Sequence, residues 1–262
     1  MNVLVCVKRV PQTGGRIVLA PDGRSIDTKY LGFTVSPHEE CAVEEAVRLV
    51  EAGGGSAVVL TLGPTEAEEQ LRDAMAIGAE RAILLETDGS DWDPVSTAGA
   101  IAAAIRDQEA AHGPFDLILF GNESADSGGF QVGIRVAVAL DRPIATGIKG
   151  LTVDSSGSSV TARREAADGG WESFELPLPA VVSVKEGINL PRYPSVPGRL
   201  RAKRREVERV VPVRPRVGTP IGPELIILRV PVEDASTAEI LGRGPEAAPA
   251  VVEMLARIGV LS

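Results

Sequence analysis

The amino-acid sequence predicts an α/β fold built around a mostly parallel β-sheet, and three features of the chain point to it. Short apolar runs alternate with helical patterns from the N-terminus to about residue 150. Thr- and Val-rich segments broken by Ser-Gly and Gly-Gly turns follow, and from residue 189 the chain is dense in Pro and Arg. Together these features predict a Rossmann-like, doubly wound sheet with added antiparallel hairpin strands and an extended C-terminal arm.

The first part of the chain supplies the parallel sheet. Continuous apolar runs are typical of strands buried on both faces, and apolar residues spaced three or four apart are typical of helices packed on one side. Because strands and helices alternate, we expect parallel strands joined by right-handed crossovers, with helices on both faces. The expected strands are residues 2–8, 56–61, 81–86 and 115–120, and the expected helices are residues 39–52, 65–77, 95–105 and 134–140.

The second half of the chain is expected to differ. Small turn residues interrupt residues 151–165 and 168–184, which predicts antiparallel hairpin strands added to the sheet. The Pro-rich stretch that follows cannot form a compact core of its own, so we expect an arm that is stable when it wraps a partner. A helix at residues 247–258 would dock at its far end. The predicted division is an α/β domain at residues 1–188 and an arm at residues 189–262.

The composition limits the function classes. The chain has 262 residues, 44% of them hydrophobic and 24% charged, so a folded core is expected. No stretch approaches the ~20 uninterrupted apolar residues that a membrane span requires, and residues 1–7 carry no charged leader, so we expect a cytoplasmic protein. The net charge of -9 argues against nucleic acid as the main ligand. We interpret the basic run at residues 199–205 as a subunit contact or docking surface.

Cysteine and histidine usage limits the chemistry. Cys6 and Cys41 form no CxxC pair, and with His38 and His112 they make no metal-ligand pattern. We expect both cysteines to be buried as small hydrophobic side chains, and the sequence predicts no catalytic residue and no metal site. Any redox work must therefore rest on a bound cofactor.

Ligands of an open parallel sheet bind outside the carboxyl ends of its strands, which directs attention to the loops after Val7, Leu62 and Phe120. The loop after Leu62 contains Gly63, which permits close backbone approach, and Thr65, which we expect to cap the following helix. An ordinary strand-to-helix turn explains this loop as well.

The loop after Phe120 is longer. Residues 121–133 contain several glycines, among them Gly128 and Gly129, and lead into a predicted helix. Free backbone N–H groups at a helix N-terminus favour an anion such as phosphate. The loop has neither the Gly-Lys-Ser/Thr of a Walker A motif nor a GxGxxG fingerprint, so phosphate binding and a long capped turn both stay open at this point. The hypothesis for residues 1–188 is a nucleotide-binding domain.

Ser36 is expected to cap the helix that follows it. Glu44 and Glu45 lie in that helix, and adjacent helical positions point about 100° apart. The two carboxylates therefore cannot share a substrate for acid–base catalysis, and we expect both on a solvated face.

Three segments, taken in order, resemble the electron-transfer flavoprotein β-subunit family. Each motif is short, but their order and spacing make the match specific, and the resemblance runs over nearly the whole chain. The first segment is residues 7–11 (VKRVP); the second is residues 36–49 (SPHEECAVEEAVRL) with residues 71–82; the third is residues 178–184 (LPAVVSV) with residues 189–197 (NLPRYPSVP) and the basic tail at residues 202–205 (AKRR).

The resemblance implies a heterodimer with a larger α subunit, an FAD carried mainly by α, and in many members an AMP buried in β. In that family β supports the flavin domain of α and contacts dehydrogenases, so it is an electron-carrier subunit and not an enzyme. The positions that match the family's nucleotide pocket are Cys6, Ser36, Leu62, Gly63, Asp126, Gly128, Gly129, Phe130, Gln131 and Val132. The positions that match its partner-binding surfaces are Tyr193, Val196 and Pro197 in the recognition loop, with Val196 as the hydrophobic anchor, and Glu165, which resembles an acidic residue that meets the flavin domain.

Departures from the family pattern leave the ligand of the pocket open. Where AMP-binding members have an acidic run followed by Asn-Gln-Thr-Gly, this chain has residues 127–133 (SGGFQVG), with Val132 in place of a hydroxyl. The Gln-Val-Gly piece also resembles electron-bifurcating members, in which β binds a second FAD in place of AMP. Val196 is smaller than the usual anchor, which would suit a different set of dehydrogenases.

The principal hypothesis is a carrier that accepts electrons from dehydrogenases, such as acyl-CoA dehydrogenases, onto a flavin held with the α subunit and passes them to a quinone oxidoreductase. One alternative is the β subunit of an electron-bifurcating complex, with NADH oxidation at a second FAD. The other is a stand-alone adenine-nucleotide-binding regulatory protein, which the Pro-rich arm disfavours.

Overall fold

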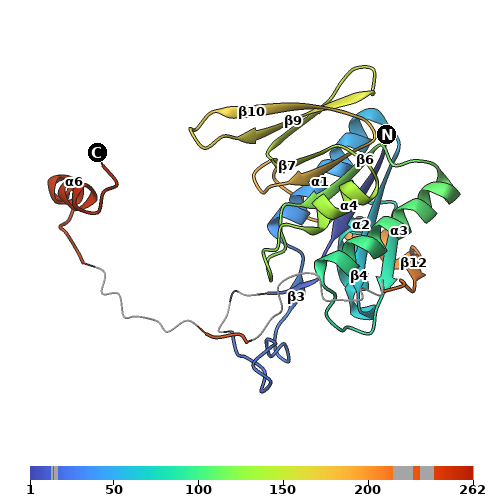
Figure 1. Cartoon of the computed structure of the whole chain (residues 1–262), viewed down its shortest axis with the longest axis horizontal. Helices are drawn as coiled ribbons and strands as arrows, with labels where there is room; N and C mark the ends of the chain where they lie inside the picture. Colours follow the sequence, from blue (N-terminus) through green and yellow to red (C-terminus); the bar gives the residue numbers. More distant parts are fainter. Residues whose placement is uncertain (13, 15–16, 215–226, 231–238, 262) are drawn as a thin grey trace. The chain divides into compact units, whose positions relative to one another are not determined.

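The structure of the chain, a computed structural model, describes residues 1–12, 14, 17–214, 227–230 and 239–261 (Figure 1). It divides into two units, which are described separately. The first unit comprises Met1–Arg16 and Asp27–Leu225, and the second comprises Ile17–Ile26 and Ile226–Ser262. The α/β fold lies in the first unit.

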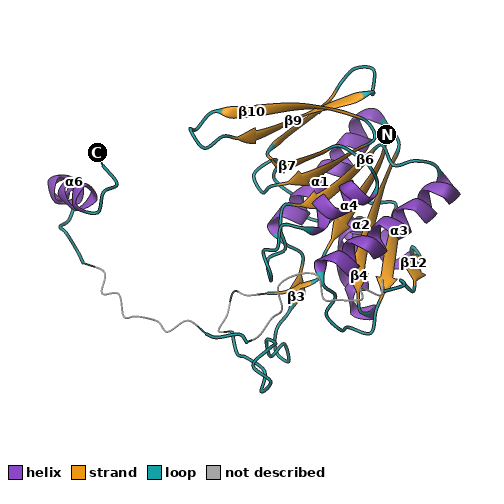
Figure 2. Cartoon of the chain, in the orientation of Figure 1, coloured by secondary structure: helices purple, strands orange, loops and turns teal. Residues whose placement is uncertain are grey.

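The first unit is built on a sheet that has seven strands in the described part of the chain (Figure 2). Its strands are β1 (Asn2–Val7), β4 (Ser56–Gly63), β5 (Arg81–Glu86), β6 (Leu117–Gly121), β7 (Ile144–Ile148), β11 (Ala180–Val184) and β12 (Val207–Val210). They lie in the order β12-β5-β4-β1-β6-β11-β7, and every neighbouring pair is parallel. The predicted parallel sheet is confirmed.

Helices cover both faces of this sheet. They are α1 (Pro37–Gly53), α2 (Glu68–Ile77), α3 (Pro94–His112), α4 (Val132–Ala139) and α5 (Val196–Arg204). Residues of α1, α2 and α5 share a buried cluster with Val3 and Val5 of β1, whereas α3 and α4 share another with Leu4 and Cys6. Successive strand residues point to opposite faces, so one apolar run contributes to two cores. The doubly wound prediction is confirmed.

The start of α1 follows the predicted cap. The Ser36 Oγ accepts a hydrogen bond from the Glu39 N–H (3.3 Å), and Glu39 Oε2 accepts one from the Ser36 N–H (2.8 Å). This reciprocal pair is a capping box. The predicted cap of the next helix is wrong, because Thr65 opens a short 3₁₀ turn, and its hydroxyl donates to Glu86 and, among the described residues, accepts no hydrogen bond from a helical N–H.

The antiparallel strands form a sheet of their own. β8 (Gly150–Val153), β9 (Ser159–Glu165) and β10 (Trp171–Pro177) make a three-stranded sheet, whereas the hairpin pattern predicted strands added to the main sheet. Their inward residues, such as Val160 and Ala162, belong to the buried cluster on the α1 side. The hairpins therefore extend the core without extending the parallel sheet.

Residues 180–184 correct a second expectation. The hairpin pattern includes them, but β11 lies in the parallel sheet between β6 and β7. All five residues of β11 are buried. An unbroken apolar run is typical of a parallel strand with both faces covered, so the Gly-Gly turn before β11 belongs to the β9–β10 hairpin alone.

Part of the predicted arm is folded onto the first unit. β12 pairs with β5, and α5 approaches α2 closely at Gly198. A Cβ at that position would lie 2.3 Å from the Ala76 carbonyl oxygen, so only glycine permits the contact. Among the described residues, none of the helices combines the length and the apolarity needed to cross a lipid bilayer.

The second unit contains a 3₁₀ turn at Pro245–Ala247 and the helix α6 (Ala248–Arg257), which confirms the predicted C-terminal helix. The arm residues 215–226 and 231–238 lie outside the described residues. The division between residues 188 and 189, and the wrapping of a partner by the arm, stay predictions.

Candidate functional site

Three strand ends meet at one edge of the sheet. β1 lies between β4 and β6, with Cys6 opposite Leu60 on one side and Phe120 on the other. The chain leaves β1 to build β4 and β5 on one side and then returns to build β6 on the other. The strand order therefore reverses at β1, and such a switch point is where open α/β sheets bind ligands.

The carboxylate of Glu39 lies inside this edge. Its Oε1 accepts a hydrogen bond from the Lys8 N–H (2.8 Å), and its Oε2 accepts the one from the Ser36 N–H. Burial raises the pKa of Glu39 to about 7, although the hydrogen bonds from Ser36 and Lys8 favour the charged form. A Cβ on Gly121 would lie 2.6 Å from the Glu39 Cγ, so the glycine that ends β6 admits the first turn of α1.

The loop after β6 leads to a helix start that no side chain of the described residues caps. Gln131 is the N-cap of α4, and its side chain makes no capping hydrogen bond. Gly128 and Phe130 have φ angles of 55° and 50°, a left-handed conformation that is unusual for a phenylalanine. The first N–H groups of a helix have no partner within it, so this turn offers backbone donors to an anion.

One ion pair crosses from β1 to this loop. The Lys8 Nζ lies 2.6 Å from the Asp126 Oδ2. Burial alone would raise the pKa of Asp126, but the hydrogen bond and charge of Lys8 hold it below its ordinary value. A second, longer contact joins His38 Nε2 to Glu123 Oε1 at 3.9 Å. The loop is thus tied to the ends of β1 and α1.

These residues include groups of the kind that binds phosphate. Backbone donors at the start of α4 and the ammonium group of Lys8 are the groups that phosphate prefers. A Cβ built on Gly129 would meet nothing within 4 Å, so there is open space beside the loop. Lys8 and Glu39 were not among the predicted site residues. Two sequence signals could have identified them. Lys8 lies directly after the first strand, and Glu39 lies three residues after a serine cap.

The predicted pocket residues divide between the two faces of the sheet. Cys6 is buried in the cluster on the α3–α4 side, and Leu62 and Val132 pack against that cluster. Ser36 belongs to the α1 side, and Gly63 ends β4, where a Cβ would lie 3.2 Å from the Ala67 Cβ. Asp126 and residues 128–131 form the loop between them. The structure thus brings these positions to one edge, with the backbone of β1 between the two groups.

Both cysteines are buried and unpaired, as predicted. Burial raises the pKa of each thiol, and in Cys6 the nearby Glu39 carboxylate adds to the effect. A raised pKa keeps a thiol protonated and unreactive, so neither cysteine is suited to redox chemistry.

The predicted partner-binding residues lie elsewhere. Tyr193 is 95% exposed and Val196 is 72% exposed, in a segment that runs from β11 to α5. Pro197 lies in the first turn of α5, which Ser195 caps. Glu165 ends β9, and its Oε2 pairs with the Lys149 Nζ at 2.8 Å. Large apolar side chains that are held in solvent mark a surface for another molecule.

The segment between β11 and α5 is bound to α1 through two residues, Glu44 and Glu45, that were expected to lie in solvent. Glu44 and Glu45 are buried, at 4% and 8% exposure, so the prediction of a solvated face is wrong. Glu44 pairs with Arg192, and Glu45 accepts a hydrogen bond from the Asn189 side chain (2.8 Å). The segment that buries these two carboxylates lies more than 140 residues away in sequence. The apolar spacing of a helix does not predict that such a distant segment will pack on its polar side.

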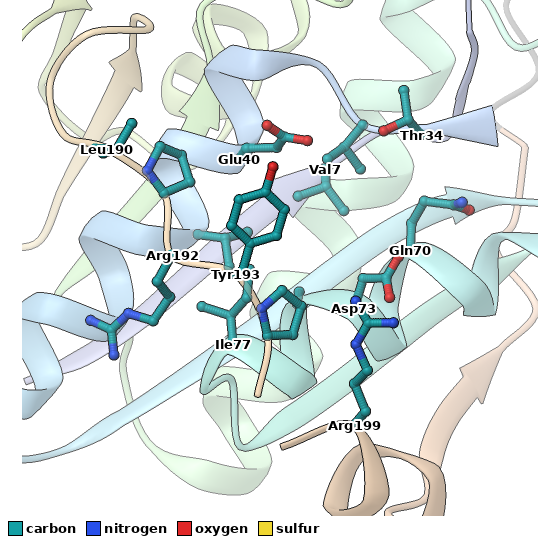
Figure 3. A pocket seen from close by; sticks show the side chains of 15 residues that line it. Val7, Thr34, Glu40, Gln70, Asp73, Ile77, Leu190, Arg192, Tyr193 and Arg199 are labelled. Atoms are coloured by element: carbon teal, nitrogen blue, oxygen red, sulfur yellow. The ribbon is translucent and has the colours of Figure 1, made fainter. Parts of the chain in front are cut away.

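A pocket of about 460 Å³ lies beneath the same segment (Figure 3). The Tyr193 ring extends across it with its hydroxyl toward Glu40, and Asp73 and Arg199 lie at the other end. Residues of α1 and α2, among them Val43 and Ile77, line the pocket together with Tyr193. The sequence gives no sign of this pocket.

Comparisons with known proteins bear on the family. A family model described as "Electron transfer flavoprotein domain" matches residues 25–214. The chain is 37% identical over 210 residues to "Electron transfer flavoprotein subunit beta" of Bacillus subtilis (strain 168), which covers 79% of this chain and 78% of that protein. Proteins of the same name from Mycobacterium leprae (strain TN) and Syntrophomonas wolfei are 36% and 38% identical over 212 and 208 residues, which cover 79% of this chain and 77% and 78% of theirs. This chain therefore belongs to the electron transfer flavoprotein family, among its β subunits.

Proposed function

We propose that this chain is the β subunit of a heterodimeric electron carrier. In this proposal the complex accepts electrons from dehydrogenases, such as acyl-CoA dehydrogenases, and delivers them to a quinone oxidoreductase. The observation that carries the proposal is the exposed apolar segment around Tyr193 and Val196, held on a fixed base by Arg192. A fixed base reduces the entropy lost on docking, and exposed aromatic side chains favour a protein partner.

The redox chemistry belongs to the cofactor. An FAD held with the α subunit would supply the electron-accepting group. The residues of this chain would position and dock, which agrees with two thiols that burial keeps protonated. Glu165 is exposed at the end of β9 and is the proposed contact to the flavin domain of α.

The edge of the sheet at the switch point is the proposed nucleotide site. Lys8 and the backbone N–H groups at the start of α4 would hold phosphate there, and the open space beside Gly129 would admit the ligand. AMP and a second FAD both carry such a phosphate. The Gln131-Val132-Gly133 sequence, which resembles bifurcating members, favours FAD, whereas the general family pattern favours AMP.

The C-terminal helix α6 is a proposed contact with the α subunit. None of its residues is buried within the described chain, and Val251 and Val252 are 39% and 54% exposed. An amphipathic helix with an uncovered apolar side gains stability when it packs on a partner. The arm predicted at residues 189–262 would then wrap that partner.

Cofactor content of the complex tests these proposals. This chain is co-expressed with a candidate α subunit from the same organism, the complex is purified, and FAD and AMP are quantified per heterodimer after release. One FAD with one AMP supports the simple carrier, and two FAD support bifurcation. Failure to form a complex, or a complex without flavin, would contradict both. A stable monomer that binds adenine nucleotide alone would favour the regulatory alternative.

A further inference from the structure

The side chain of Lys8 spans the gap at the switch point. Lys8 follows β1, and its Nζ lies 2.6 Å from the Oδ2 of Asp126 in the loop after β6. β1 and β6 are neighbouring strands, so this ion pair crosses between their carboxyl ends. A ligand that binds at this edge of the sheet would therefore lie close to both charges.

We infer that Lys8 is the side chain that binds the phosphate of the nucleotide, and that the Asp126 carboxylate competes with this phosphate for the Lys8 ammonium group. The inference rests on the nucleotide site proposed above and adds the residue that recognises the ligand. Asp126 was predicted to contact the nucleotide. In this inference its carboxylate instead competes with the nucleotide for Lys8. Phosphate is common to AMP and FAD, so the inference holds for either.

The chemistry of the pair supports competition. Carboxylate and phosphate both present charged oxygens, and an ammonium group binds either as a point charge. The Lys8 side chain is 47% exposed and that of Asp126 is 25% exposed, so the pair is accessible to solvent. Exposed ion pairs are weak, and the doubly charged phosphate of AMP, or the two singly charged phosphates of FAD, can displace one carboxylate.

The backbone around Lys8 is fixed while its side chain can turn. The Lys8 N–H donates to the buried Glu39 carboxylate at 2.8 Å, which holds the end of β1 against α1. On the other side of the pair, Asp126 lies between the β6 end and two glycines, Gly128 and Gly129. Glycine gives the loop the conformational freedom to move the carboxylate away from Lys8.

Other cations near the loop are engaged elsewhere. The Arg135 guanidinium donates from Nε and Nη2 to the Gln131 Oε1 at 3.3 and 3.1 Å, and His38 faces Glu123. Of the basic residues the structure describes at the loop, Lys8 is the one whose partner is a carboxylate of the loop itself at hydrogen-bond distance. Lys8 and the uncapped turn of α4 are therefore the two groups that this inference assigns to the phosphate.

The test is calorimetric titration of the purified complex of this chain with its α subunit, freed of AMP by dialysis. AMP and adenosine are compared in the wild type, K8M, K8R and D126N. We expect K8M to weaken AMP binding about tenfold or more and to leave adenosine binding unchanged, because adenosine has no phosphate. K8R keeps the charge and should stay within about threefold of the wild type. D126N should strengthen AMP binding about two- to fivefold.

The outcomes separate this inference from the function on which it rests. Equal AMP affinity in K8M and wild type, or weaker AMP binding in D126N, would overturn the inference and leave the nucleotide site intact. Absence of AMP and adenosine binding in the wild type would remove the nucleotide site and the inference together. If K8M does not assemble, D126N still decides the role of Asp126, because a carboxylate that contacts the ligand predicts weaker AMP binding in D126N, whereas a carboxylate that competes with the phosphate predicts tighter binding.

Discussion

Arg192 forms a bidentate ion pair with the buried carboxylate of Glu44. Its Nε and Nη2 donate to both carboxylate oxygens of Glu44 at 2.9 to 3.1 Å, and its backbone N–H donates to Oε2 at 3.1 Å. The same guanidinium donates to Glu51 at 2.7 and 2.9 Å. Because a bidentate pair fixes the orientation of the arginine side chain as well as its position, it sets the direction in which the backbone continues to Tyr193.

Arg192→Met should destabilise the fold and loosen this segment. It would leave the Glu44 carboxylate buried without its partner, and because Arg192 itself is more than a third exposed, we expect a loss of about 1–2 kcal/mol in the free energy of unfolding. Urea denaturation of the full chain measures this loss. Arg201→Met, at an exposed arginine of α5, is the matched control and should change stability by less than about 0.5 kcal/mol.

A double-mutant comparison separates the effect of the buried charge from that of packing. In a Glu44→Gln background the buried charge is gone, so Arg192→Met should cost less than it does in the wild type. Equal losses in the two backgrounds would mean that packing, and not the ion pair, carries the effect.

In the proposed carrier, Val196→Glu should disrupt docking to dehydrogenases. An exposed apolar anchor that is replaced by a charge loses its contact in a desolvated interface, and we expect kcat/KM for electron transfer to fall about 30-fold or more. FAD per heterodimer should stay unchanged. The assay is reduction of the complex by an acyl-CoA dehydrogenase at limiting complex concentration.

Val138→Glu is the control for that experiment. Val138 is 74% exposed, similar to Val196, but it lies on α4, on the opposite face of the sheet from α5. Unchanged coupling in Val196→Glu, or an equal loss in Val138→Glu, would remove the assignment of residues 190–197 as the docking segment.

The layers of the fold were predictable because they depend on local patterns. The apolar run at residues 2–8 and the Ser36 cap each contain their own signal, and both appear in the structure nearly where expected. The placement of residues 180–184 was not predictable from turns alone. Whether a strand pairs with a hairpin neighbour or joins a distant parallel strand depends on which faces become covered, and β11 pairs with β6, which lies some 60 residues earlier.

The site likewise has features that local sequence patterns predict and features that depend on distant residues. The loop after Phe120 stood out by its glycines, but the ion pair between Lys8 and Asp126 joins residues 118 apart. The burial of Glu44 depends in the same way on Arg192, 148 residues later. Long-range partners of charged residues leave little trace in one sequence, although Glu44 and Glu51, two helical turns apart on one side of α1, are a pattern that a single arginine can bridge.

Gly129→Leu should deplete the nucleotide. A Cβ there meets nothing within 4 Å, so the fold should accept the substitution, while the larger side chain would take up the space beside the loop. We expect AMP affinity to fall about tenfold, measured as nucleotide retained per heterodimer and by titration. Gly53→Leu, at the end of α1, also has nothing within 4 Å of the new Cβ and should retain nucleotide. Equal nucleotide content in both variants would show that the pocket lies elsewhere.

The last prediction concerns pH and Glu39. Burial raises its pKa from 4.5 to about 7, so between these values the folded chain binds a proton that the unfolded chain has released. Stability therefore falls as pH rises through this window, by up to about 3 kcal/mol, and becomes level above pH 7. Glu39→Gln cannot titrate, although it also alters one of the two backbone hydrogen bonds and so adds a constant offset.

The quantity to measure is the difference in free energy of unfolding between wild type and Glu39→Gln, from urea denaturation of the full chain at several pH values from 4.5 to 8. It should decrease steadily to about pH 7 and then stay constant. Glu40→Gln, at the exposed neighbour, should give a smaller slope of the same sign, because burial raises the pKa of Glu40 as well. A difference that rises with pH would show that the hydrogen bonds from Lys8 and Ser36 outweigh burial, and that Glu39 is a stabilising carboxylate at neutral pH.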